Sequence, residues 1–460
     1  MSSTASDSLL AAPTRATRPL TVQRQLHQLV ILGGLTLFYI SMIMPARLQV
    51  TMSVVTLSPP ANAVAYGVGY PYFTILDAVM LAWGLAFWFL TGAFRRTHSS
   101  AVLVYVGVSL LSAVIAGYRY SVGLESDFFM DGVLGAVRLL AAYAVFASVP
   151  SSEARWARRL QNALAILFVV SLFLNHAGFQ QAGTYSNEAG RLTASGFDFA
   201  TTSYFGGVLV LSALTMAQGR RRWVLVCAGL VGLAMGGGRL ALTIALPTIA
   251  FTVLRSRPVI RRTLIRIGLI GAALAVIAVV TLPSLLERIP TFRRSIDDAV
   301  YYVKPSELSV IAERYFPLLR SAGITHPAVL GRFNVWASAL QLLDDRHWQP
   351  AGSDWRVQQG LELLGVPSHS HNGYLQTALK FGPLAFLVWV PLAGTTWRGL
   401  RRRSPYGLIL LFLLLSLAFD YWMLVAKALF LLYAFAALND RWLAEHPRQR
   451  LEHQPVGTGD

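Results

Sequence analysis

Two histidines separated by a single residue stand in the part of this sequence whose residue types are best suited to chemistry. They belong to the box HSHNGYLQ, residues 369–376, which closes a long polar stretch and opens an apolar run. Asn372 is predicted to cap the helix that starts there. A helix N-terminus carries partial positive charge and unpaired N–H groups, which favour a phosphate and disfavour imidazolium. His371 is therefore expected to be neutral and able to accept a proton, with His369 and Tyr374 in supporting positions. The alternative is an interfacial histidine that only caps the helix.

Two arginines are placed to meet an anion. Arg239 follows three glycines, residues 236–238, and starts the apolar run 239–255. The run before it, residues 223–235, makes roughly 20 Å of helix, against a hydrocarbon layer about 30 Å thick. Arg239 should therefore be recessed, where a guanidinium needs a carboxylate or a ligand phosphate as partner. Arg332 is predicted to precede an amphipathic helix and to point toward whatever the start of that helix faces.

A metal site is the rival interpretation of the histidines. Histidines and aspartates of the polar stretch could supply ligands, namely His326, His347, His369, His371, Asp344, Asp345 and Asp354. None has the i, i+4 helical spacing of a zinc protease. The single cysteine, Cys227, excludes an intrachain disulfide and a cysteine-based metal site, and is expected to pack as a small buried hydrophobe. The sequence therefore predicts no metal and no cofactor.

The composition indicates an integral membrane protein. Of the 460 residues, 55% are hydrophobic and only 13% are charged, whereas soluble chains carry about a quarter charged residues. The formal charge of +17 would suggest nucleic acid in a soluble protein. Here the basic residues flank apolar runs, where retention in the cytoplasm and anionic lipid headgroups explain them. Membrane lipids are thus expected partners, and nucleic acid is not.

The predicted fold class is all-α, a polytopic membrane protein with about 12 transmembrane helices and one large helical periplasmic loop. The spans are 28–46, 72–94, 100–118, 131–150, 159–178, 200–217, 223–236, 239–255, 264–283, 373–393, 407–420 and 421–438. Arginine-rich loops alternate along the chain, which places both termini in the cytoplasm and the polar stretch outside. The domains are a cytoplasmic tail, 1–27; helices 1–9, 28–283; the periplasmic loop, 284–372; helices 10–12, 373–438; and a cytoplasmic tail, 439–460.

Charges inside the spans gather toward their outer ends in this topology. They are Asp77, Arg138, Lys380, Asp420 and Lys427. Each could reach the interface by snorkelling, but together they favour a polar cavity that faces outward. In the loop, apolar residues recur at helical spacing from Leu308 to Leu319 and from Phe333 to Leu343, which predicts two amphipathic helices over the cavity mouth.

The motifs of this sequence resemble those of the O-antigen ligase and Wzy-type polysaccharide polymerase superfamily. The box 369–376 followed by Phe381-Gly382 is similar to its histidine signature. Gly331-Arg332 with Trp336 resembles its Gly-Arg-x-x-x-Trp element, and Gly238-Arg239 with Thr243 resembles its Ser/Gly-Arg segment. Gly190-Arg191 with Ser195-Gly196-Phe197 resembles its Arg-x-x-x-Gly-x-Phe element, although Asp198-Phe199-Ala200 follows where the family often has Pro-Asn.

The resemblance implies an inverting glycosyltransferase whose donor is an undecaprenyl-diphosphate-linked oligosaccharide or polysaccharide, without metal or sugar nucleotide. Arg239, Arg332 and Arg191 would hold the diphosphate, and His371 would activate the acceptor hydroxyl. Localisation would be the bacterial inner membrane, with the active site facing the periplasm.

The acceptor is either a growing glycan, as in a polymerase of O-antigen or exopolysaccharide, or lipid A-core of lipopolysaccharide, as in a ligase. The His-Asn-Gly-Tyr-Leu form of the box favours the polymerase. Aromatic residues of the loop could stack on sugars of either acceptor, namely Trp348, Trp355, Tyr301 and Tyr302. A twelve-helix transporter or flippase of lipid-linked glycans, or a non-catalytic assembly partner, is the alternative.

Overall fold

The computed structural model describes a bundle of α-helices. The residues described are 22–43, 53–55, 73–90, 92, 100–124, 131–150, 154–176, 199–235, 239–255, 308–323, 327–352, 357, 360–361, 363–365, 370–418 and 427–446. A helix lies on each predicted span except 264–283, which falls outside the described residues. The all-helical prediction is therefore confirmed for the architecture.

The first half of the bundle contains α1 (Val22–Ile43), α4 (Ile75–Leu90), α6 (Ser100–Ser121), α7 (Asp131–Ala147), α8 (Ala154–His176), α9 (Phe199–Met216), α10 (Gly219–Met235) and α11 (Arg239–Arg255). The second half contains α15 (Val310–Tyr315), α16 (Leu318–Ser321), α17 (Pro327–Asp345), α19 (Gly373–Phe381), α20 (Ala385–Arg401), α21 (Gly407–Leu417) and α23 (Lys427–Glu445). The prediction missed one small antiparallel sheet, in which β1 (Ser53–Val55) pairs with β2 (Phe73–Thr74). Its residues are mainly β-branched and aromatic, which suits strands.

One hydrophobic core runs through the bundle and includes buried residues of α1, α4, α6, α7, α8, α9, α10, α11, α19, α20, α21 and α23. Small residues let some of these helices approach closely. A side chain added at Gly206 of α9 would begin 2.7 Å from the carbonyl oxygen of Gly229 in α10. Van der Waals packing at such small residues is how helices associate in a membrane, where lipid is as apolar as the side chains.

Among the described residues, two helical stretches are long and apolar enough to cross a membrane, Ser100–Ser121 and Gly373–Arg401. Other apolar helices, such as Ala78–Leu90 and Thr202–Met216, are shorter. The number of spans and their orientation therefore remain predictions.

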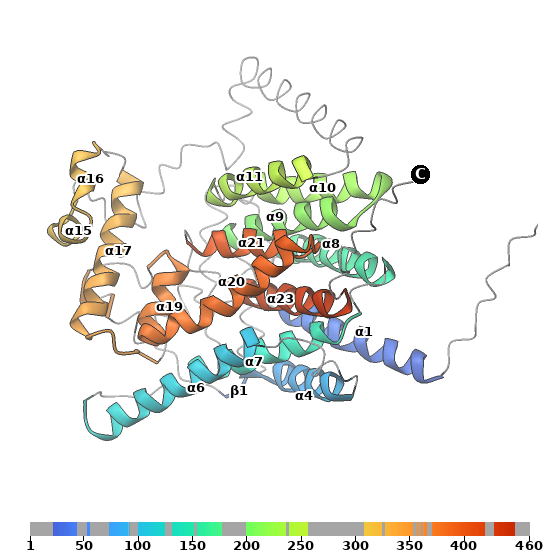
Figure 1. Ribbon diagram of the computed structural model, residues 1–460, viewed down its shortest axis with the longest axis horizontal. Helices are drawn as coiled ribbons and strands as arrows, with labels where there is room; N and C mark the ends of the chain where they lie inside the picture. The colour runs from blue at the N-terminus through green and yellow to red at the C-terminus, as the bar shows by residue number, and fades with distance from the viewer. Residues whose placement is uncertain are drawn as a thin grey trace, which may run out of the picture.

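The span predicted at 373–393 is not one continuous helix. α19 ends at Phe381, Gly382 adopts φ 58° and ψ −141°, and a 3-10 turn, η1 (Gly382–Leu384), leads into α20. This region of backbone conformation is open essentially to glycine alone, and Pro383 cannot donate a helical hydrogen bond. The break sets α19 and α20 in different directions (Figure 1).

The helices predicted in the polar loop are present as α15, α16 and α17, which lie together at one end of the bundle beside α19 (Figure 1). We call this the loop end. The first predicted helix is divided in two because Pro317 follows α15 and precedes α16. Phe333 of α17 packs edge-to-face against Phe316, with ring centroids 5.2 Å apart, and against Trp336, at 5.3 Å. The first of these contacts joins the end of α15 to α17.

The prediction for Arg332 was wrong in one respect. α17 begins at Pro327, so Arg332 lies inside the helix and does not precede it. Proline is favoured in the first turn of a helix because its missing N–H group has no helical partner there. Arg332 therefore extends from the side of α17 and is partly buried.

The structure also differs from two predictions about single side chains. Cys227 is exposed on α10 and is not a buried hydrophobe. Arg138 and Lys380 are 8% and 7% exposed, so neither reaches the surface by snorkelling. The side chains of Asp77, Asp420 and Lys427 lie outside the described residues.

Candidate active site

His371 lies on the turn that leads into α19, at the loop end of the bundle. Its backbone is in the left-handed region, with φ 49°. Only a few per cent of non-glycine residues adopt a positive φ, and histidine, asparagine and aspartate are enriched among them. Such conformations persist where the surrounding structure holds them, and they cluster at functional sites.

Asn372 caps α19, as predicted. Its side-chain oxygen accepts hydrogen bonds from the backbone N–H groups of Tyr374, at 2.9 Å, and Leu375, at 3.0 Å. These are two of the N–H groups expected to be available to a phosphate. Since the cap already uses them, the arginines must supply most of the attraction for an anion here.

Ser370 and Gln376 hold the turn, which was not anticipated from the sequence. The Ser370 N–H donates to the Gln376 side-chain oxygen at 3.2 Å, and the Ser370 hydroxyl donates to the Asn372 carbonyl at 2.8 Å. Ser370 is 0% exposed and Gln376 is 2% exposed. Their position inside the box could have predicted this role, because a polar side chain that is buried there needs hydrogen-bond partners. Together they keep His371 between two anchored residues.

Tyr374 ties α19 to its neighbours. Its hydroxyl donates to the Leu414 carbonyl of α21 at 2.9 Å, and its ring packs edge-to-face on Trp389 of α20, with centroids 4.9 Å apart. This hydroxyl is therefore engaged in packing. Tyr374 thereby anchors the helix that His371 precedes, and the supporting role predicted for it in the reaction stays a prediction.

The structure brings His371 close enough to Arg332 for their charges to interact. Burial, and then the positive charge of Arg332, lower the pKa of His371 to about 3 from its ordinary value of 6.5. The imidazole is therefore neutral at physiological pH, as predicted. The cause of this lowered pKa differs from the predicted one. Burial and the charge of Arg332 lower it, whereas the field of the helix N-terminus was expected to do so.

The other predicted site residues are described less fully. Arg239 is the first residue of α11, as predicted, but its side chain lies outside the described residues. Arg191 and His369 also lie outside them. Both α11 and α19 contact α21, the latter through Tyr374.

A tight turn, residues 346–352, fastens the loop end to the bundle; we call it the strap. Its Ala351 N–H donates to the Leu379 carbonyl at 3.2 Å, and its Gly352 N–H donates to the Lys380 carbonyl at 2.9 Å. The Ser112 hydroxyl of α6 donates to the same Lys380 carbonyl at 3.3 Å. The strap thus joins the end of α17 to α19, and the Lys380 carbonyl that it bonds also binds α6.

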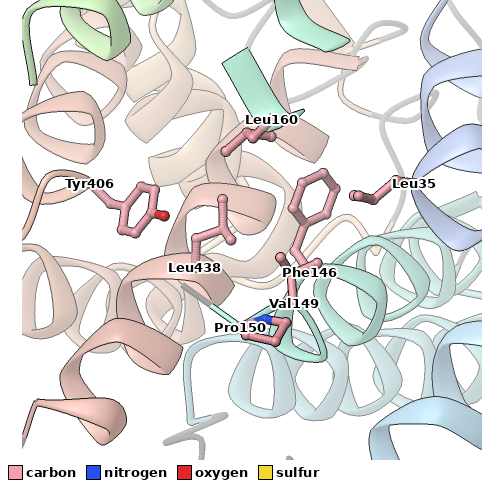
Figure 2. Close-up of a pocket in the computed structure, with 7 residues that line it drawn as sticks. All are labelled: Leu35, Phe146, Val149, Pro150, Leu160, Tyr406 and Leu438. Carbon is pink, nitrogen blue, oxygen red and sulfur yellow. The ribbon is translucent and has the colours of Figure 1, made fainter. Parts of the chain in front are cut away.

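A small apolar cavity lies elsewhere, between α1, α7, α8, α21 and α23. Figure 2 shows its lining residues, Leu35, Phe146, Val149, Pro150, Leu160, Tyr406 and Leu438. It has room for one water molecule at most. Its size and apolar lining make it unsuited to an anionic glycan donor.

In the part of the chain that the structure describes, no group of three or more histidine, cysteine, aspartate or glutamate side chains is arranged to hold a metal ion. Asp344, one of the suggested ligands, instead accepts hydrogen bonds from Tyr315 and Trp348.

Residues 205–390 match the O-antigen ligase family model (Wzy_C). The matched segment contains Arg239, Arg332 and the box 369–376, and it ends within α20. The resemblance inferred from these motifs is confirmed over this segment. Arg191 lies before it. No curated protein and no solved structure matches the chain.

The similarity is to a class of membrane enzymes that transfer lipid-linked glycans. The order of the elements within residues 205–390 agrees with the order of the motifs: α9 and α10, Arg239 at the start of α11, Arg332 in α17, and His371 before α19. The segment therefore contains every predicted site residue except Arg191.

Proposed function

We propose that this chain is an inverting membrane glycosyltransferase that takes a glycan from an undecaprenyl-diphosphate-linked donor and transfers it to an acceptor hydroxyl at the periplasmic face. The observation that carries this proposal is the neutral imidazole of His371, held in a strained, capped turn beside the Arg332 guanidinium. The O-antigen ligase match over residues 205–390 supports the substrate class.

In the proposed reaction, Arg332 and Arg239 bind the diphosphate, with Arg191 as a further candidate. Guanidinium stays charged and binds phosphate oxygens through two parallel hydrogen bonds. The acceptor oxygen attacks the anomeric carbon from the side opposite the diphosphate, and His371 takes its proton. The bond from the anomeric carbon to the diphosphate breaks with its electron pair on oxygen, where the arginines stabilise the negative charge.

A pKa of about 3 makes His371 a weak base before the donor binds. A bound diphosphate would change this, because it neutralises Arg332 and adds negative charge near the imidazole. Both effects raise the pKa of His371 toward the operating pH, where a general base is most effective. The donor would thereby activate the base that consumes it, and an empty site would not abstract protons.

We assign the acceptor to a growing glycan chain, so that the enzyme is a polysaccharide polymerase, on the form of the box His371-Asn372-Gly373-Tyr374-Leu375. Attachment of the glycan to lipid A-core, a ligase reaction, is the second candidate, and the description of the matched family favours it. A deletion strain separates them: loss of a polymerase leaves single repeat units on the carrier lipid, whereas loss of a ligase leaves full-length chains there.

The test of the general reaction is reconstitution. The full chain is placed in liposomes with purified lipid-linked oligosaccharide, and transfer is followed by a shift in glycan size together with release of undecaprenyl diphosphate. His371→Ala should abolish transfer. His371→Asn should abolish transfer as well. Asparagine tolerates a positive φ, so backbone strain at position 371 would not explain that loss. His446→Ala, at an exposed histidine that follows α23, is the matched control and should keep normal activity. Near-normal transfer by both His371 variants would refute the base assignment.

A further inference from the structure

The loop end carries an exposed aromatic surface that the candidate active site does not use. Trp348 of the strap is 44% exposed. Its indole N–H donates to one carboxylate oxygen of Asp344 at 3.2 Å, and the Tyr315 hydroxyl donates to the other oxygen at 2.5 Å. One carboxylate thus orients two aromatic rings, one from α15 and one from the strap. We call Trp348, Asp344 and Tyr315 the aromatic platform.

The backbone holds Trp348 in an unusual conformation. His347 and Trp348 both have positive φ values, 50° and 59°. Two consecutive non-glycine residues in the left-handed region raise the free energy of the fold by roughly 1–2 kcal/mol each. The Trp348 N–H donates to the Leu343 carbonyl at 2.8 Å, which closes the end of α17 over this strained turn.

The bundle itself holds the turn in place. A side chain added at Gly382 would begin 2.3 Å from the Trp348 carbonyl oxygen, and one added at Gly352 would begin 2.7 Å from Ala116 of α6. The backbone of Trp348 therefore rests on the break between α19 and α20. Strain that is held from several sides in this way is typical of residues whose position matters for binding.

We infer that the aromatic platform binds a sugar ring of the glycan substrate. This ring lies a few sugar units along the glycan from the glycosidic bond that reacts. This deepens the proposed function and rests on it. The partly exposed indole offers an apolar surface that suits the C–H face of a pyranose. The Asp344 oxygens each accept one hydrogen bond within the platform and each have a second lone pair for a sugar hydroxyl.

The position of the platform agrees with this role. α19 has nine residues between His371 and Gly382, which separates the base from the Trp348 contact by about 14 Å at 1.5 Å per residue. At that distance the platform would lie beyond the reacting sugar and within reach of the next sugars of the glycan. The hydrogen bond to Asp344 also keeps Tyr315 a donor, since burial and that bond raise the pKa of its hydroxyl.

The binding test uses the full chain in nanodiscs, in a His371→Asn background that prevents turnover. The probe is the free repeat-unit oligosaccharide released from the lipid-linked donor, and its Kd is measured by calorimetry. Trp348→Ala should raise Kd about tenfold, equivalent to about 1.4 kcal/mol. Asp344→Asn and Tyr315→Phe should each raise it less. The matched control is Trp397→Ala, because Trp397 is 66% exposed on α20 and its removal should leave Kd unchanged.

A kinetic test in the His371 enzyme identifies the glycan concerned. Trp348→Ala should raise KM and leave kcat within about twofold, because the platform does not touch the reacting atoms. A higher KM for the acceptor assigns the platform to the acceptor glycan, and a higher KM for the donor assigns it to the donor glycan.

If Kd for the free oligosaccharide and both KM values are unchanged, the proposal is wrong. It is also wrong if the effect is confined to lipid-borne substrates, which would indicate membrane anchoring. Oligosaccharide binding is measured without turnover, so it can fail or succeed independently of the proposed transferase activity.

Discussion

The carbonyl oxygen of Trp348 lies 2.3 Å from the point where a side chain at Gly382 would begin. No side chain can occupy that space, so position 382 must remain glycine for the strap to rest against the end of α19. Gly382 also has φ 58° and ψ −141°, a conformation open essentially to glycine. One residue thus breaks the predicted span 373–393 and fastens the loop end to the bundle.

Gly382→Ala should destabilise the protein by about 1–3 kcal/mol from backbone strain alone, and further through displacement of the strap. Thermal unfolding in detergent and protease sensitivity near residues 346–352 measure the two effects. Gly394→Ala is the control, since an added side chain there meets no atom within 4 Å; alanine in that helix should be neutral or stabilising. An unchanged midpoint for Gly382→Ala would contradict the role given to this contact.

Arg332→Ala should lower kcat/KM for the lipid-linked donor by about 10²–10³-fold, because it removes a donor aimed at the charge that develops on the leaving diphosphate. Arg332→Lys should recover part of the lost kcat/KM, because an ammonium keeps the positive charge but cannot form the bidentate hydrogen bonds of a guanidinium. Removal of the positive charge should also raise the pKa of His371 in the empty site, which can be followed by NMR of labelled histidine.

The control for Arg332 is Arg401→Ala, which removes the same charge at an exposed position in the last turn of α20. Its activity should stay within about twofold of the parent. If Arg332→Ala turns over donor normally, the diphosphate is bound elsewhere.

His371 should make stability depend on pH. Its pKa is about 3 in the folded protein and 6.5 ordinarily, so between these values the unfolded chain binds a proton that the folded protein excludes. Stability should therefore fall as the pH falls from about 6.5 toward about 3. At pH 5 the loss is about 2 kcal/mol, from a difference of roughly 1.5 pH units.

Unfolding measured at pH 7 and pH 5 tests this dependence. His371→Asn should lose about 2 kcal/mol less than the parent over this interval, because the titrating group is absent. His446→Ala should keep the parent's dependence. Equal slopes for the parent and His371→Asn would show that the imidazole is accessible to protons in the folded protein.

Transfer should survive EDTA, since the proposed mechanism relies on arginine for charge stabilisation and on His371 for proton transfer. The reconstituted enzyme is assayed before and after dialysis against chelator. Activity that is lost on chelation and restored by a divalent ion would overturn the metal-free mechanism.

Much of this protein followed from local properties of the sequence. Apolar runs predicted the helices because burial of the backbone in lipid requires internal hydrogen bonds. Asn372 was recognised as a cap because its residue type and its position before an apolar run are local signals. The histidine box and the Gly-Arg elements identified the family-like segment that residues 205–390 match.

Relationships between distant residues were decided only by the tertiary structure. The charge of Arg332 reaches His371 because α17 packs on α19, and no spacing in the chain encodes that contact. The close approach of the Trp348 carbonyl to Gly382 joins positions 34 residues apart in the sequence. Trp348 was one of several aromatic candidates until Asp344 and Tyr315 were placed beside it. Local hydrogen bonding and hydrophobicity can be read along a chain, whereas steric exclusion and the pKa of a buried group depend on atoms that only folding brings together.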